Sequence, residues 1–167
     1  MERTLKKTLI SLYKNELFQS VLPFWLEKSP DRKYGGYFTC LTREGDVFDT
    51  DKFVWLQARQ VWLFSVLYNR VEPREEWLET ATHGARFLLD HGHDGSFNWY
   101  FSLARNGDPL VVPYNIFSNT FASMAMGQMH LATGESRYGE AALQTFRQTL
   151  KRRENPKGKW SKSIPST

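Results

Sequence analysis

The stretch LTREGD at residues 41–46 recurs 62 residues later as LARNGD at residues 103–108. Each copy stands between an aromatic segment typical of a strand and an apolar segment typical of a buried helix, and its glycine suits the tight turn of a β-hairpin. The chain therefore contains a repeat, whose unit we predict to be a surface helix, a hairpin and an inner helix. Units of this kind bury their apolar faces against their neighbours.

Five helices are predicted around the two hairpins. The apolar residues follow helical spacing over residues 5–27, 53–69, 74–91, 116–132 and 136–152. We expect the first to pack one face on the body, and the second and fourth to lie on the inner, concave side of an arc with both hairpins at one end. The pattern favours an all-α fold with short β-hairpins, a partial α/α toroid, because five helices are too few to close the ring.

Length and composition indicate a single globular unit. The 167 residues are 41% hydrophobic and 15% aromatic, enough for a core, and 24% charged. No run approaches the roughly 18 apolar residues of a membrane helix, and the N-terminus lacks the apolar region of a secretory signal. Since Cys40 is the single cysteine, we expect a cytoplasmic protein that has no disulfide and no membrane contact.

The positive charge is concentrated at the C-terminal end. Residues 151–167 carry a formal charge of +5, so the rest of the chain is close to neutral, at −1. A surface-wide footprint for nucleic acid is therefore not expected. We predict a domain over residues 1–154 and a basic loop or truncated tail over residues 155–167.

Arg59 is the first candidate for a functional role. It lies in the middle of the apolar segment 53–69, between two tryptophans, and an unpaired guanidinium is costly to bury. We expect a partner, and two kinds remain open. One is an oxyanion or the oxygens of a sugar, and the other is a structural salt bridge to Asp49 or Asp51.

The junctions between the hairpins and the inner helices offer further polar side chains. Tyr114 and Asn115 follow the second hairpin as Lys52 follows the first, and in a toroid such junctions rim the cavity. Contact with a ligand is one interpretation. A helix N-cap with a rim tyrosine is the other.

The histidines form no strong metal or catalytic pattern. His91 and His93 beside Asp94 are a weak match, since alternate residues in a loop converge poorly and no second cluster supplies ligands. No serine–histidine–acid set and no nucleotide-binding glycine motif is present. We predict no metal site.

The C-terminal tail holds residue types that cradle phosphates, without the spacing of a Walker A motif. A phosphate-binding loop and a disordered basic end both remain open. The residues concerned are Lys157, Gly158, Lys159, Ser161 and Lys162.

Three segments resemble the N-acylglucosamine 2-epimerase family, namely GGYFTCL at 35–41, KFVWLQARQVW at 52–62 and PYNIFS at 113–118. The resemblance covers almost the whole chain. It implies an (α/α)6-barrel, of which this chain is similar to the N-terminal two fifths. It also implies an isomerase that interconverts N-acetyl-D-glucosamine and N-acetyl-D-mannosamine, or the epimers of another sugar, by removing and returning the proton on C2.

The resemblance also implies roles for particular residues. Arg59 and Tyr114 match substrate-binding positions of the family, whereas the family's catalytic histidines lie beyond Thr167, so no catalytic residue is expected here and the chain alone is expected to be inactive. No chemical cofactor is implied. ATP is implied as an activator that is not consumed, with the lysine-rich tail as its contact, and the complete protein is expected to be a homodimer that binds an amino sugar.

Two other functions remain open from the sequence. A catalytically inactive fragment that binds a sugar or a partner would keep Arg59 without turnover. A nucleic-acid-binding module would depend on residues 151–167 and lose affinity as salt rises.

Overall fold

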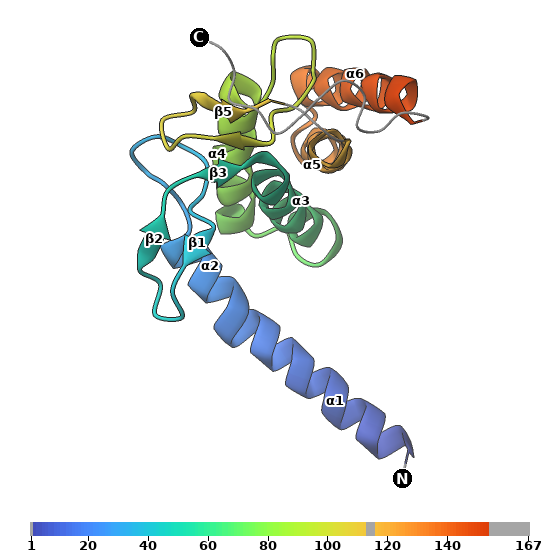
Figure 1. The fold of residues 1–167 in the computed structure, drawn as a ribbon. Coiled ribbons are helices and arrows are strands. Elements are labelled where there is room, and N and C mark those ends of the chain that lie inside the picture. Colours follow the sequence, from blue (N-terminus) through green and yellow to red (C-terminus); the bar gives the residue numbers. More distant parts are fainter. Residues whose placement is uncertain (1, 113–115, 154–167) are drawn as a thin grey trace.

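The computed structural model describes residues 2–112 and 116–153 (Figure 1). All five predicted helices are present. Their bounds are α1 Glu2–Glu16, a π-helical turn Leu17–Val21 and α2 Leu22–Lys28, then α3 Val54–Arg70, α4 Glu75–His91, α5 Phe117–Thr133 and α6 Ser136–Arg152. None of the helices in these two stretches is both long and apolar enough to cross a membrane.

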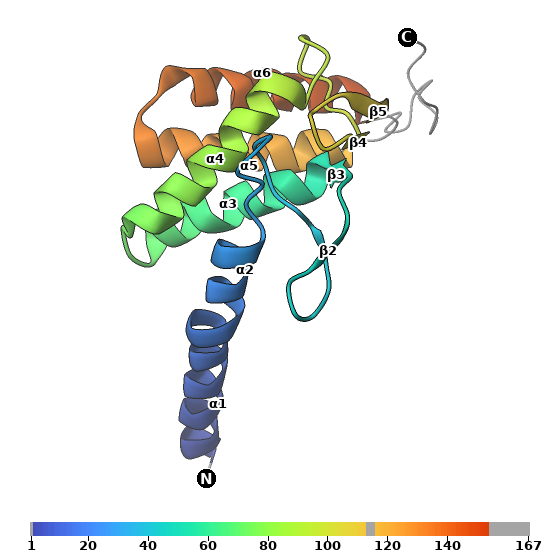
Figure 2. The same ribbon diagram turned by 90° about the vertical axis from the view of Figure 1, so that its left-hand side faces the viewer.

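The first predicted helix is one rod made of three segments. Pro23 has no N–H to donate, and the hydrogen-bond ladder changes register before it, so that the N–H of Leu22 bonds the carbonyl of Leu17. Only the end of this rod packs on the body, through residues such as Phe18, Leu22 and Trp25. The expectation that the whole first helix packs one face is wrong for α1, which projects from the body (Figures 1 and 2).

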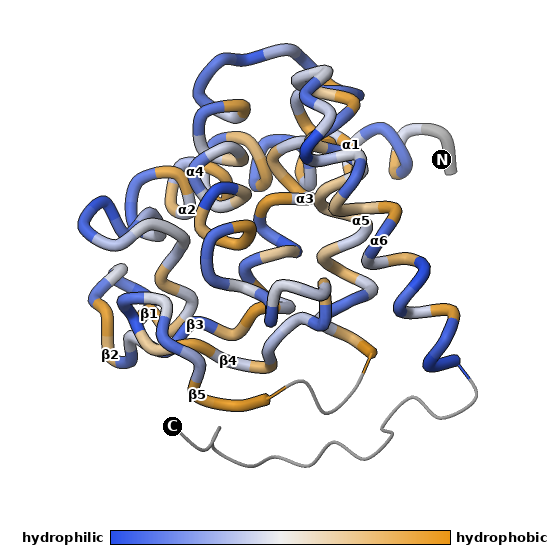
Figure 3. Tube along the Cα trace, turned by 90° about the horizontal axis from the view of Figure 1, so that it is seen from above, coloured by the Kyte–Doolittle hydropathy of each residue, from blue (hydrophilic) through white to orange (hydrophobic). Residues whose placement is uncertain are grey.

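The other helices form a layer in the order α4, α3, α5, α6. Helix α3 packs on both α4 and α5, and α5 packs on α6 (Figure 2). The second and fourth predicted helices are thus neighbours, and each carries one outer helix. Hydrophobic and hydrophilic turns alternate along α6 (Figure 3), as expected of an outer helix with one buried face.

Both hairpins form at the same end of the layer. Strands β1 (Cys40–Leu41) and β2 (Val47–Asp49) pair antiparallel, and β3 (Lys52–Phe53), β4 (Ser102–Leu103) and β5 (Pro109–Val111) form a sheet in that order. Because β3 continues from the first hairpin and pairs with β4 of the second, the predicted placement is confirmed.

The strands are shorter than predicted because the backbone before each hairpin bonds an inner helix instead. The N–H of Tyr37 donates to Gln57 Oε1 at 2.7 Å, and Gln57 Nε2 donates back to the Tyr37 carbonyl at 2.8 Å. In the second unit, the N–H of Trp99 donates to Asn119 Oδ1 at 3.2 Å. Both pairs are 62 residues apart, so the repeat seen in the hairpin turns extends into the helices.

The two units differ in how completely they satisfy this contact. Asn119 is fully buried, and its Nδ2 has no hydrogen-bond partner in the part of the chain that the structure describes. An asparagine is one methylene shorter than a glutamine, which accounts for the missing second bond. The first unit is therefore the more tightly tied of the two.

Candidate functional site

Arg59 lies on α3 with its guanidinium over two aromatic rings. The guanidinium carbon is 5.8 Å from the ring centre of Trp55 and 5.3 Å from that of Phe121 on α5. The two rings are 6.2 Å apart and tilted by 39°. Cation–π contacts hold the charged group in place, and they leave its N–H donors available to a ligand.

The expected surroundings of Arg59 were wrong in one respect. The side chain is exposed rather than buried, so it needs no internal counter-ion. The salt bridges among the described residues involve other groups, and the predicted alternative of a bridge to Asp49 or Asp51 is not realised. Of the two interpretations, the structure leaves contact with a ligand.

A cavity of about 270 Å³ adjoins Arg59. Leu56, Arg59, Gln60 and Leu63 line it from one face of α3, since residues three and four apart share a face. The remaining lining residues are Trp25, Thr39 and Trp62. The site thus combines one cation with mostly apolar walls, a combination typical of sites for small molecules.

The other predicted rim position, Lys52, has a structural role. Its side chain is fully buried, and Nζ donates to Asp31 Oδ2 at 3.1 Å and to the carbonyls of Gly35 at 2.6 Å and Arg105 at 2.8 Å. The guanidinium of Arg105 binds the same carboxylate through both oxygens, at 2.9 and 3.2 Å. This Asp31–Lys52–Arg105 network ties together the loops of both repeat units.

The network holds Asp31 ionised. Burial alone raises the pKa of its carboxyl, but hydrogen bonds from Arg105 and Lys52 outweigh burial and lower that pKa to about 2. Burial lowers the pKa of Lys52, and the hydrogen bond to Asp31 opposes this. The pair is thus charged at neutral pH and fully hydrogen-bonded, the condition under which a buried ion pair is tolerated.

We expect the stability of the protein to depend on pH through Asp31. Its pKa is lower in the folded state than the ordinary value of 3.8, so the unfolded chain takes up the proton first as the pH falls. The free energy of unfolding should drop between about pH 4 and pH 2 by on the order of 2 kcal/mol. Urea titrations across this range measure the slope. Asp31→Asn should flatten it, and an unchanged slope in that variant contradicts the assignment.

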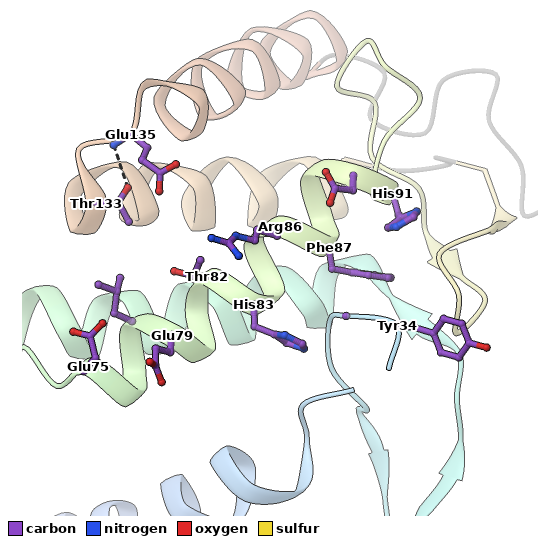
Figure 4. A pocket seen from close by; sticks show the side chains of 13 residues that line it. Tyr34, Glu75, Glu79, Thr82, His83, Arg86, Phe87, His91, Thr133 and Glu135 are labelled. Atoms are coloured by element: carbon purple, nitrogen blue, oxygen red, sulfur yellow. Dashed lines mark hydrogen bonds between the residues drawn. The ribbon is translucent and has the colours of Figure 1, made fainter. Parts of the chain in front are cut away.

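A larger cavity of about 650 Å³ runs along the outer flank of α4 (Figure 4). Its walls carry both acidic and basic side chains, among them Glu79, His83 and Arg86. His83 is already engaged, since its Nε2 lies 2.9 Å from the carbonyl of Gly36 and burial lowers its pKa. Because this cavity lies on an outer helix, away from Arg59, we do not take it as the candidate site.

None of the four histidines lines the cavity beside Arg59. The ring of His91 packs on Phe87, His93 Nδ1 accepts from the N–H of Gly95 at 3.1 Å, and His130 Nδ1 lies 3.0 Å from the carbonyl of Glu135. Within residues 2–112 and 116–153, no group of three histidine, cysteine or acidic side chains is placed to hold a metal ion.

Several predicted residues lie outside the described ranges, and their roles stay predictions. These are Tyr114 and Asn115 at the second junction and Lys157, Gly158, Lys159, Ser161 and Lys162 in the tail.

Sequence reasoning missed the two rings that hold Arg59. Phe121 stands 62 residues after Arg59, so the two occupy the same position in neighbouring repeat units. Applied inside the helices, the repeat spacing would have placed them side by side. No comparable signal existed for Trp55, whose apolar ring looks like any other core residue.

Comparisons with known proteins agree with this fold. A family model described as N-acylglucosamine 2-epimerase (GlcNAc 2-epimerase) matches residues 36–165. The chain is 40% identical to the N-acylglucosamine 2-epimerase of Bos taurus over 150 residues, which are 87% of this chain and 36% of the relative. It is 34% identical to the cellobiose 2-epimerase of Bacteroides fragilis over 137 residues, 81% of this chain and 34% of the relative. The chain thus spans about a third of these relatives.

A solved structure shows the same arrangement. The cellobiose 2-epimerase of Spirochaeta thermophila matches with a TM-score of 0.81 and 27% identity, over 99% of this chain and 43% of that chain. Such epimerases are (α/α)6-barrels, and the predicted fold class, the N-terminal part of such a barrel, is confirmed.

Proposed function

Because the chain belongs to the N-acylglucosamine 2-epimerase family, we propose that it forms the Arg59 wall of a sugar 2-epimerase that interconverts N-acetyl-D-glucosamine and N-acetyl-D-mannosamine. The observation that carries the proposal is the exposed guanidinium of Arg59, held by Trp55 and Phe121 beside a cavity. The amino sugar is favoured as the substrate because identity to the mammalian N-acylglucosamine 2-epimerases, 40–42%, exceeds the 26–34% to cellobiose 2-epimerases.

The chemistry explains why an arginine is useful at this place. In the open-chain sugar, the C2 proton is acidified by the neighbouring C1 aldehyde, and its removal leaves an enediolate with negative charge on oxygen. Returning the proton on the other face completes the epimerisation, so one base per face is needed. Arg59 is suited to the charge, since a guanidinium stays protonated and offers several N–H donors in a fixed plane.

The bases belong, on this proposal, to the part of the enzyme that this chain does not span. No histidine of the described residues reaches the Arg59 cavity, and the resemblance implies histidines in the C-terminal half of the family. We propose that the complete enzyme is a cytoplasmic homodimer without a chemical cofactor.

We expect the 167-residue chain alone to give no measurable turnover, and a chimera to be active. The chimera joins this chain to the part of the Bos taurus enzyme that the chain does not span. Incubation of N-acetyl-D-mannosamine in D2O, followed by NMR, measures both the epimer formed and the deuterium gained at C2. Turnover by the chain alone contradicts the division of labour, and preference for cellobiose by the chimera contradicts the substrate.

A catalytically inactive sugar-binding role is the second candidate, and the exposed Arg59 favours it equally. It predicts that the chain alone binds N-acetyl-D-glucosamine, and that the chimera is folded without turnover. Chemical-shift changes around Arg59 on adding the sugar, combined with the D2O assay, separate the two.

We further propose that ATP activates the complete enzyme through the lysine-rich tail. Lys159→Ala and Lys162→Ala in the chimera should each weaken activation, because each removes a cation that balances the phosphate charge. The ATP concentration that gives half-maximal activity measures the effect, with Lys14→Ala, an exposed lysine on α1, as the control. Unchanged ATP dependence in both tail variants refutes this role.

A further inference from the structure

Helix α1 exposes an apolar stripe that nothing in the described chain covers. Leu5, Leu9, Leu12 and Tyr13 are 41–70% exposed, and their spacing of three and four places them on one face. The only element that α1 contacts extensively is the π-helical turn that follows it. Both views show the helix extending away from the body (Figures 1 and 2).

A second uncovered surface adjoins the stripe. The cavity beside Arg59 is bounded by Trp25 of α2, the segment that continues α1 into the body, and by Leu56 and Leu63 on a free face of α3. The Oγ1 atom of Thr39 in its wall is buried without a hydrogen-bond partner among the described residues. Helix α5 packs elsewhere on α3, so this face of α3 is also without a neighbouring helix.

We propose that the α1 stripe and the cavity wall on α2 and α3 form one docking surface, and that its occupant is the last helical pair of the epimerase barrel. In a closed ring of helical pairs, the first pair has two neighbours, the second pair and the last. The Spirochaeta thermophila structure matches 99% of this chain, α1 included, over only 43% of its own length. Helix α1 therefore has its place in a protein with further chain available to cover it.

Two features of the surface select this occupant over a second copy of the chain. A helix is long and narrow enough to lie along α1 and continue past Trp25 to Leu63, whereas pairing of two α1 helices would cover the stripe and leave the cavity wall bare. The proposal rests on the fold and on family membership. It does not rest on the proposed reaction.

The test uses the full 167-residue chain, co-expressed with the part of the Bos taurus N-acylglucosamine 2-epimerase that the chain does not span. We expect a 1:1 complex by size-exclusion chromatography with light scattering. In hydrogen exchange, the α1 amides should exchange about tenfold more slowly in the complex than in the free chain, because local opening of α1 then requires the interface to break.

Substitutions distinguish the proposed surface from general stickiness. Leu9→Glu and Leu63→Glu should each weaken the complex by about 30-fold or more, since each places a charge in a covered apolar contact. Val71→Glu is the matched control, because Val71 is 56% exposed in the turn after α3, outside the surface. Circular dichroism of the free variants checks that the helices persist.

Three results would overturn the proposal. The first is a bovine fragment that stays insoluble or fails to copurify with the chain. The second is a homodimer of this chain that Leu9→Glu dissociates. The third is a Val71→Glu chain that binds as poorly as Leu9→Glu. All of these readouts are independent of catalysis, so an inactive but correctly assembled complex would refute only the proposed function.

Discussion

Replacing Arg59 by alanine in the active chimera is expected to lower kcat by on the order of 100-fold or more, the usual cost of removing one donor to a developing oxyanion. The loss should appear mainly in kcat, because the negative charge on oxygen develops after the sugar has bound. Steady-state kinetics with N-acetyl-D-mannosamine measures it. Because Arg59 is exposed and forms no salt bridge within the described residues, the variant should fold as well as the parent.

Two further variants separate a catalytic role from loss of a surface charge. Arg70→Ala removes another exposed arginine, at the end of α3, and should leave kcat unchanged. Phe121→Leu keeps Arg59 but removes one ring beneath it, and should cost up to about tenfold, the range of a cation–π contact. Near-normal turnover of Arg59→Ala contradicts the assignment, whatever the other two variants do.

Replacing Lys52 by methionine is expected to lower the free energy of unfolding by about 3–5 kcal/mol, as is usual when one partner of a buried ion pair is removed. The change removes three hydrogen bonds and leaves the carbonyls of Gly35 and Arg105 without this donor. Urea unfolding followed by circular dichroism is the measurement, since guanidinium would screen the charges.

The control for this prediction is Lys28→Met. Lys28 is 40% exposed and paired only with its neighbour Glu27, so its loss should change stability by less than about 0.5 kcal/mol. A loss below about 1 kcal/mol for Lys52→Met would show that the network is not needed for stability.

The helices and hairpins were predictable because their signals are local. The spacing of apolar residues along residues 53–69 depends on one segment of chain, as does a glycine in a four-residue turn. The strand lengths were not predictable from such signals, because Tyr37 bonds Gln57, 20 residues away, in place of a strand partner.

The site was predicted in part for the same reason. Arg59 stood out by its position in an apolar helix and by the LQARQVW motif, but its burial was wrong because the composition of a helix does not tell which face borders an open cavity. The Asp31–Lys52–Arg105 network joins residues 21, 53 and 74 positions apart. No pattern within one segment indicates such a contact, and Arg43, the repeat equivalent of Arg105, is simply exposed.

The pairing of Arg59 with Phe121 has a consequence for how a duplicated structure acquires polarity. The two residues are the same site in successive copies of one unit, yet one now carries the charge and the other the ring on which that charge rests. A ring of identical units presents the same surface in every direction, and a bound sugar would have no preferred orientation within it. Divergence at this single position distinguishes one sector of the wall from the next, and a molecule with two different faces at C2 then has one way to lie.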